Sequence, residues 1–303
     1  MEVATQKTER AKRLPSLWNG KIPLRDRAID HATLIADENV LLEAYEQVLD
    51  YGLCLIENVP PQDGSVVSVA GLFGLVSPSP YADDPAQPQL ENIRVDPAVP
   101  VNTRKCDFLG PHTDTCWRTS LSGLIYLHCL KSHEKGGKTL LVDGFSVLHR
   151  FRESSPDAFD LLVSTLLPFK AKVSNGDDWR AQGRIISLDA DGEICGIRYS
   201  AGSIDWDVYP FGKDHPVTKA LSELESCLYS EDASLQIQLQ PGDMLAVDNH
   251  RVLHGRTAFD PTAGERQLQT CSTRRDEFHN LYRHLARRLG RADWDHDLPL
   301  GVI

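Results

Sequence analysis

The sequence lacks any run of about 20 apolar residues, the length that a membrane-spanning helix requires. Its first residues, 1–13, carry several charges but not the apolar stretch that a secretory signal needs. We therefore expect no membrane segment and a cytoplasmic location.

The sequence also lacks an excess of positive charge. The 32 Lys and Arg residues are outnumbered by 43 Asp and Glu residues, which gives a net charge of -11. Nucleic acids and anionic membranes select basic surfaces, so neither is an expected partner. The expected partner is a small-molecule substrate.

The seven cysteines are odd in number, and no two are spaced as CxxC. This pattern suggests neither a disulfide framework nor a structural zinc site. A reducing compartment fits such a chain best.

At 303 residues with 41% hydrophobic content, the chain is long enough for one large core. Residues 1–30 are polar and include Pro15 and Pro23, so we expect an arm lying on the body, with folding proper starting near Ala36. Residues 31–303 are expected to form a single domain.

Apolar periodicity predicts a few helices and many short strands. The expected helices are 37–51, 65–73, 144–162, 217–229 and 275–289. The expected strands are 53–59, 90–95, 123–130, 138–144, 235–240 and 244–249, with a hairpin at Asp191-Gly192. This order indicates a mainly β fold with flanking helices, an antiparallel sandwich or jelly roll. The apolar face of helix 275–289 could cover its own core or join a homodimer.

The motif His112-Thr113-Asp114 is the strongest sign of chemistry. On a strand, residues two apart point to the same side, so His112 and Asp114 can converge on one ion while Thr113 points away. The later segment DNHRVLHGR offers His250 or His254 as a third ligand, and spacing alone does not choose between them. Two histidines and one carboxylate make the facial triad of non-haem Fe(II) sites, which leaves positions open, whereas structural zinc is closed by four protein ligands.

Six segments together resemble a known family. The resemblance runs from about Ala36 to Leu289, and its segments are YGLCLIENVP, HTD, YLHCLKSHEKGGKTLLVDGF, GIRYS, PGDMLAVDNHRVLHGR and RQLQTCSTRRDEF. In this order they resemble the Fe(II)- and 2-oxoglutarate-dependent dioxygenases of the taurine dioxygenase superfamily, in the γ-butyrobetaine and trimethyllysine hydroxylase branch.

The resemblance implies a double-stranded β-helix, a distorted, cupin-like jelly roll with Fe(II) at one open end. It implies His112, Asp114 and His254 as metal ligands, with 2-oxoglutarate and O2 as cosubstrates. It further implies that Arg266 and Thr139 bind the distal carboxylate of 2-oxoglutarate, a task that suits the planar guanidinium fork.

The chain also departs from its relatives. Taurine dioxygenase has a second arginine four residues after the first, where this chain has Thr270, which leaves open what binds the 2-oxo acid end. The zinc-binding N-terminal domain of the branch has no counterpart here, so we expect a catalytic domain alone. Trp117 is the best-placed residue for an aromatic cage, and Arg118 and Tyr199 are further candidates for substrate contact.

The resemblance thus implies oxidation of an unactivated C–H bond, most simply hydroxylation, in a small amino-acid-like or quaternary-ammonium metabolite. Desaturation or cyclisation by the same chemistry is one alternative. A catalytically silent protein that binds 2-oxoglutarate is another, and a zinc hydrolase is a third.

Overall fold

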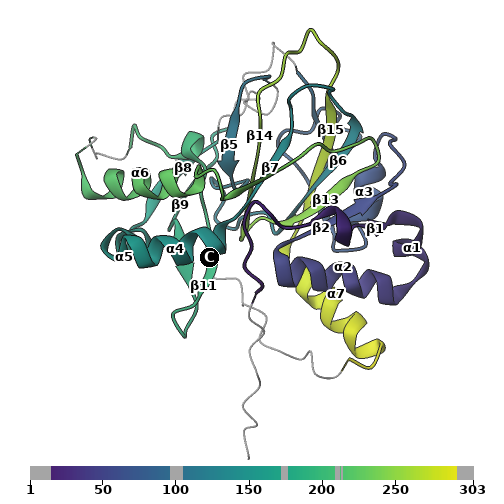
Figure 1. Cartoon of the computed structure of the whole chain (residues 1–303), viewed down its shortest axis with the longest axis horizontal. Helices are drawn as coiled ribbons and strands as arrows, with labels where there is room; N and C mark the ends of the chain where they lie inside the picture. Colours follow the sequence, from purple (N-terminus) through teal and green to yellow (C-terminus); the bar gives the residue numbers. More distant parts are fainter. Residues whose placement is uncertain (1–14, 96–104, 172–176, 209–211, 213, 292–303) are drawn as a thin grey trace, which may run out of the picture.

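Two β-sheets form the centre of the molecule in the computed structural model, which describes residues 15–95, 105–171, 177–208, 212 and 214–291 (Figure 1). Within these residues the larger sheet has seven strands, in the order β1 (Ile29–Asp30), β2 (Leu53–Glu57), β13 (Met244–Asp248), β6 (Leu124–Lys131), β15 (Gln267–Thr273) and β3 (Val76–Ser77), with β4 (Glu91–Ile93) also paired to β15. The smaller sheet has the order β12 (Ser234–Ile237), β7 (Thr139–Asp143), β14 (Val252–Arg256) and β5 (Leu109–His112).

Successive strands cross between the two sheets. From β4 to β7 the chain alternates larger, smaller, larger, smaller, and from β12 to β15 it alternates smaller, larger, smaller, larger. This alternation is the winding of a double-stranded β-helix. The expected mainly β, jelly-roll fold is confirmed.

Strand β13 shows how the core is arranged. Leu245 and Val247 pack between the two sheets with Leu141 of β7, whereas Met244 and Ala246 pack on the outer face of the larger sheet. Because both faces of this strand are buried, its sequence is continuously apolar instead of alternating.

A layer of helices covers the outer face of the larger sheet (Figure 1). It contains the short η1 (Arg25–Arg27), α1 (His31–Ala36), α2 (Glu38–Tyr51), α3 (Ser65–Ala70) and α7 (Arg275–Arg288). The predicted helix 37–51 is confirmed: the Asp37 carboxylate accepts the Asn39 N–H at 2.8 Å, and Gly52 ends the helix at a φ of 76°. Phe278 and Tyr282 of α7 are buried in the same core, so its apolar face covers this chain.

A second group of elements lies beside the smaller sheet (Figure 1). It contains α4 (Gly144–Ser154), α5 (Pro156–Ser164), β8 (Leu167–Lys170), β9 (Arg180–Gly183), β10 (Ile186–Leu188), β11 (Ile194–Ile197), η3 (Ala201–Ser203) and α6 (Pro216–Leu228). The single helix predicted over 144–162 is wrong, because the chain leaves the helical conformation at Ser155 and Pro156 starts a second helix. The hairpin at Asp191-Gly192 is confirmed, with Gly192 at a φ of 81°.

Part of the predicted arm belongs to the body. Trp18 is buried, its backbone N–H donates to Asp143 Oδ2 at 3.0 Å, and its indole N–H donates to the Tyr51 carbonyl at 2.7 Å. The expectation that folding starts near Ala36 is therefore wrong, because the indole fills the core between the sheets. Residues 1–14 of the arm lie outside the described residues. Among the described helices, none has the length and apolarity to cross a membrane.

A buried ion pair joins the end of β7 to the start of β14. The Arg251 guanidinium donates to both oxygens of Asp143, at 3.0 Å from Nε and 2.9 Å from Nη2. It also donates to the Asp50 and Ser16 carbonyls, and Asp143 accepts the Phe145 N–H that opens α4. Every charged atom of the pair thus has a partner, which is the condition for a buried pair to be tolerated.

Replacing Asp143 by Ala leaves the Arg251 guanidinium buried without its counter-ion. We expect Asp143→Ala to lower the free energy of unfolding by about 3–5 kcal/mol, as measured by urea denaturation. The matched control is Asp232→Ala, which removes the carboxylate of an exposed pair with Arg150 and should leave the urea midpoint nearly unchanged. Equal, small losses in the two variants would contradict this account of the buried pair.

Candidate metal centre

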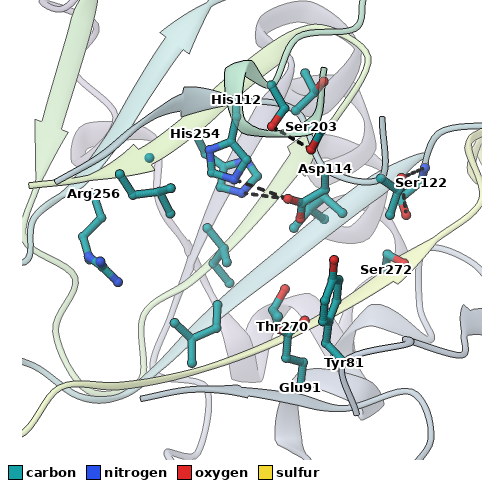
Figure 2. A pocket seen from close by; sticks show the side chains of 18 of the residues that line it. Tyr81, Glu91, His112, Asp114, Ser122, Ser203, His254, Arg256, Thr270 and Ser272 are labelled. Atoms are coloured by element: carbon teal, nitrogen blue, oxygen red, sulfur yellow. Dashed lines mark hydrogen bonds and ion pairs between the residues drawn. The ribbon is translucent and has the colours of Figure 1, made fainter. Parts of the chain in front are cut away.

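Two histidines meet where strands β5 and β14 pair. His112 and His254 are direct partners across these antiparallel strands, and their ring centroids lie 4.5 Å apart. Figure 2 shows the two rings side by side, with Asp114 opposite them. The sheet register alone therefore brings together side chains that are 142 positions apart (254 minus 112).

Asp114 is held by its neighbours on both sides. Thr113 points away, as its place between the two ligands predicts: its backbone N–H donates to the Tyr199 carbonyl at 2.7 Å, and its hydroxyl accepts the Tyr199 N–H at 3.0 Å. The buried Asn249 accepts the Asp114 N–H at 2.7 Å and donates to the Asp114 and Ser122 carbonyls at 3.1 and 3.0 Å. This amide clamp fixes the backbone from which the carboxylate projects.

The three side chains fit a divalent metal ion. Asp114 Oδ1 lies 3.4 Å from His112 Nε2 and 3.7 Å from His254 Nε2, and one ligand atom from each residue lies within 4.8 Å of the others. His112 Nδ1 donates to the Gly110 carbonyl at 2.9 Å, which leaves the Nε2 lone pair for a metal. The Asp114 side chain is 33% exposed, so an ion held here would keep one side open.

The electrostatics prepare His254 and Asp114 for coordination, whereas a metal at His112 must displace a proton. Burial lowers the pKa of His254 to about 4, although the Asp114 charge opposes this shift, so the ring is neutral at pH 7. Burial would raise the pKa of Asp114, but the two histidines outweigh it and lower that pKa to about 2. Burial also disfavours charge on His112, but the hydrogen bond and charge of Asp114 prevail and raise its pKa.

His250 lies outside this cluster. Its backbone N–H donates to Asp248 Oδ1 at 3.0 Å, and Asp248 pairs with Arg275 at 2.8 Å. Burial and the Arg275 charge lower the pKa of His250 to about 4. The structure therefore groups His254, and not His250, with His112 and Asp114.

The three side chains open into a cavity of about 330 Å³, and a cationic wall lies on one side of them. Arg256, Arg266 and Thr139 line this wall, and both guanidiniums lie near the Phe259 ring, at 5.2 and 5.8 Å. Arg266 Nε donates to the Gly137 carbonyl at 2.9 Å. Burial and the neighbouring Arg256 lower the pKa of Arg266 to about 10, so it stays charged and suits an anionic ligand.

The three candidates for substrate contact are placed differently. Trp117 and Arg118 line the cavity. Tyr199 is 2% exposed and packs into the core between α4, α5 and α6, outside the cavity wall. Tyr199 was a poor choice because its backbone pairs with Thr113, which turns its ring inward.

Several residues of the site were not predicted from the sequence. Arg256 stands two places after His254 on a strand, so the same alternation that joins His112 to Asp114 could have found it. Asn249 was not predicted, because only the histidines of its segment, such as the adjacent His250, were considered as functional residues. Glu91 and Tyr81 also line the cavity and carry no sequence signal. The place of Glu91 depends on how β4 pairs with β15.

Comparison with known proteins agrees with this geometry. A family model described as "Taurine catabolism dioxygenase TauD, TfdA family" matches residues 23–272. The γ-butyrobetaine dioxygenase of Pseudomonas sp. (strain AK-1) is 30% identical over 82% of this chain, and the mitochondrial trimethyllysine dioxygenase of Bos taurus is 29% identical over 89% of it. The chain spans 63% of the length of each of these relatives.

Solved structures support the fold. An asparagine oxygenase in complex with Fe(II), hydroxyasparagine and succinate superposes with a TM-score of 0.60 at 16% identity, covering 80% of both chains. A taurine dioxygenase from Burkholderia xenovorans superposes with a TM-score of 0.59 at 14% identity, covering 78% of this chain and 82% of its own.

Removing the Asn249 clamp should loosen the backbone that carries Asp114. We expect Asn249→Ala to weaken divalent-metal binding about 10- to 100-fold, as measured by calorimetric titration with Fe(II) without oxygen. Asn19→Ala, an exposed asparagine in the N-terminal arm, is the control and should bind metal as the wild type does. Unchanged affinity in Asn249→Ala would show that the clamp does not position the carboxylate.

Gly255 allows the two histidine strands to approach. A Cβ atom at this position would lie 2.5 Å from the Leu109 carbonyl oxygen and 3.0 Å from the Gly110 backbone, and neither can give way without moving β5. We expect Gly255→Ala to separate His112 from His254 and to abolish tight metal binding in the same titration. Gly196→Ala in β11, where a Cβ would meet Ser187 at an ordinary 3.5 Å, is the control. Wild-type affinity in Gly255→Ala would refute this role.

Proposed function

Because the chain belongs to the taurine catabolism dioxygenase TauD, TfdA family, we propose that it is an Fe(II)- and 2-oxoglutarate-dependent dioxygenase that hydroxylates a small molecule. One observation carries the proposal: an open His-Asp-His cluster and a buried cationic wall share one cavity. A zinc hydrolase would need the first of these features and not the second.

In this proposal His112, Asp114 and His254 hold the iron. The bound metal would supply the activation of O2, coupled to decarboxylation of 2-oxoglutarate, that oxidation of a C–H bond requires. The protein contributes a fixed carboxylate, two oriented imidazoles and a cavity that limits the access of water.

Arg266 and Thr139 would bind the distal carboxylate of 2-oxoglutarate. In support of this role, Arg266 makes no ion pair with a carboxylate of the described residues, and its terminal nitrogens have no protein acceptor there. Arg256, the cross-strand partner of Thr139, adds a second positive charge to the same wall. A buried cation without a counter-ion is costly, so an anionic cosubstrate would relieve the cost.

We further propose that residues 31–303 act as one catalytic domain, into whose core residues 15–30 of the arm pack. The shared cores of the two sheets support this unit. The cysteines of the described residues are free thiols, which supports a reducing compartment such as the cytoplasm.

A titration without oxygen tests the proposal. Fe(II)-loaded wild type should develop a visible charge-transfer band as 2-oxoglutarate is added, and Asp114→Ala should develop none. Arg266→Met should need about 10- to 100-fold more 2-oxoglutarate for half of the band, because a charge-assisted hydrogen-bonded contact is lost.

The control for Arg266→Met is Arg150→Met, which removes an exposed arginine remote from the cavity and should titrate as the wild type does. If wild-type protein with bound Fe(II) shows no band, the dioxygenase proposal is wrong. If Arg266→Met titrates normally, 2-oxoglutarate is bound elsewhere in the cavity.

A further inference from the structure

A second part of the cavity wall carries two opposite charges. Glu91 and Arg118 both line this wall, and Tyr81 lies close to both. Since neither charged residue belongs to the metal cluster or to the cationic wall, their presence in the cavity lining calls for a separate explanation.

Glu91 is placed in the cavity by the short strand β4. Leu90 turns into the core under the helical layer, Glu91 turns into the cavity, and Asn92 turns out again to accept a hydrogen bond from Gln269 at 3.0 Å. Glu91 is the direct partner of Thr270 on β15 and is only 8% exposed (Figure 2). Strand alternation therefore fixes a buried carboxylate beside a threonine hydroxyl.

Arg118 is an arginine without an acidic partner among the described residues. Its guanidinium carbon lies 5.2 Å from the ring centroids of both Trp117 and Trp179, and its Nε is buried without a hydrogen-bond partner within the described chain. Burial lowers the pKa of Arg118, and only the nearby Tyr81 opposes that shift. An anion from outside the protein would satisfy this group.

Tyr81 lies between these charges and the metal cluster. Its phenol accepts a hydrogen bond from Trp117, and Figure 2 shows it directed from the opposite wall towards Asp114. Burial raises the pKa of Tyr81, the charges of Glu91 and Asp114 raise it further, and Arg118 acts against them. The phenol is therefore neutral and remains a hydrogen-bond donor in the cavity lining.

We propose that this wall selects a zwitterionic amino acid whose ammonium group carries N–H bonds. Glu91 accepts hydrogen bonds from the ammonium, with Thr270 beside it, and Arg118 binds the carboxylate. The proposal rests on the dioxygenase function above, since it names the substrate class of the same cavity. It also identifies Glu91 as a specificity residue.

A quaternary ammonium head fits this wall less well. It has no N–H bond to donate to Glu91, and the Trp117 ring that would form its cage already has the Arg118 guanidinium at 5.2 Å. A second cation at that ring would meet like charge in a poorly solvated site. The two ammonium types therefore give opposite predictions.

Binding experiments with matched ligands test the inference on the full chain. The Fe(II)- and 2-oxoglutarate-loaded protein would be screened without oxygen, by thermal shift and then calorimetry, against the common α-amino acids, their N-trimethyl derivatives and their carboxamides. We expect at least one amino acid to bind, and both of its derivatives to bind about tenfold more weakly or worse.

Two variants link each ligand change to one residue. Glu91→Gln should remove the preference for the free ammonium over its trimethyl form while keeping the preference for carboxylate over carboxamide. Arg118→Gln should do the reverse. Glu223→Gln, an exposed carboxylate on α6, is the control, and the 2-oxoglutarate band in each variant reports that the cavity is folded.

Each other outcome is decisive. Tighter or equal binding of the trimethyl forms by the wild type overturns the inference, and so does an equal loss for all ligands in Glu91→Gln. If no amino acid binds although the band forms, the inference fails and the dioxygenase function stands. If amino acids bind with the expected preferences but no band forms, the zwitterion site stands and the dioxygenase function fails.

Discussion

The buried pair of Arg251 and Asp143 is the constraint on which the site depends. It joins the last residue of β7 to the residue before β14, and Asp143 and Val252 are the first partners of the ladder between these strands. Once this end is fixed, each later residue of β14 has a set partner, and His254 falls opposite His112 on β5. A slip of one residue would turn both His254 and Arg256 away from the cavity.

The charged residues of the cavity form three groups. The cationic wall of Arg256 and Arg266 lies beside Phe259, the carboxylate of Asp114 lies at the centre, and Glu91 and Arg118 occupy the far wall. Leaving the Arg266 guanidinium buried without a counter-ion among the described residues opposes folding, so the intact core must offset the cost. The same imbalance favours an anionic ligand, so the residues that line the cavity indicate what it binds.

Much of the fold follows from local patterns, but not all of the site does. Helix 37–51 could be predicted because its apolar spacing, its Asp37 cap and Gly52 all agree. The break before Pro156 could also have been predicted, because proline favours the first turn of a helix, but the single helix 144–162 did not take it into account. Glu91 could not be predicted, because an isolated carboxylate before a short strand becomes a cavity residue only when β4 pairs with β15. The prediction that Tyr199 contacts the substrate failed for the opposite reason. Its motif lies near the site in the sequence and in space, but its ring points into the core.

The elements that hold the two sets of residues differ in rigidity. His254 lies on the inner strand β14, which is paired on both sides, and His112 lies on its neighbour β5. Glu91 lies on β4, a strand of three residues paired only to β15, and Arg118 lies in the turn after Asp114. Substitutions in β4 or that turn can therefore alter the substrate wall without changing the register that assembles the metal centre. This separation explains how one metal geometry can serve different substrates, because the chemistry depends on the register between β14 and β5, whereas the choice of molecule depends on β4 and the turn.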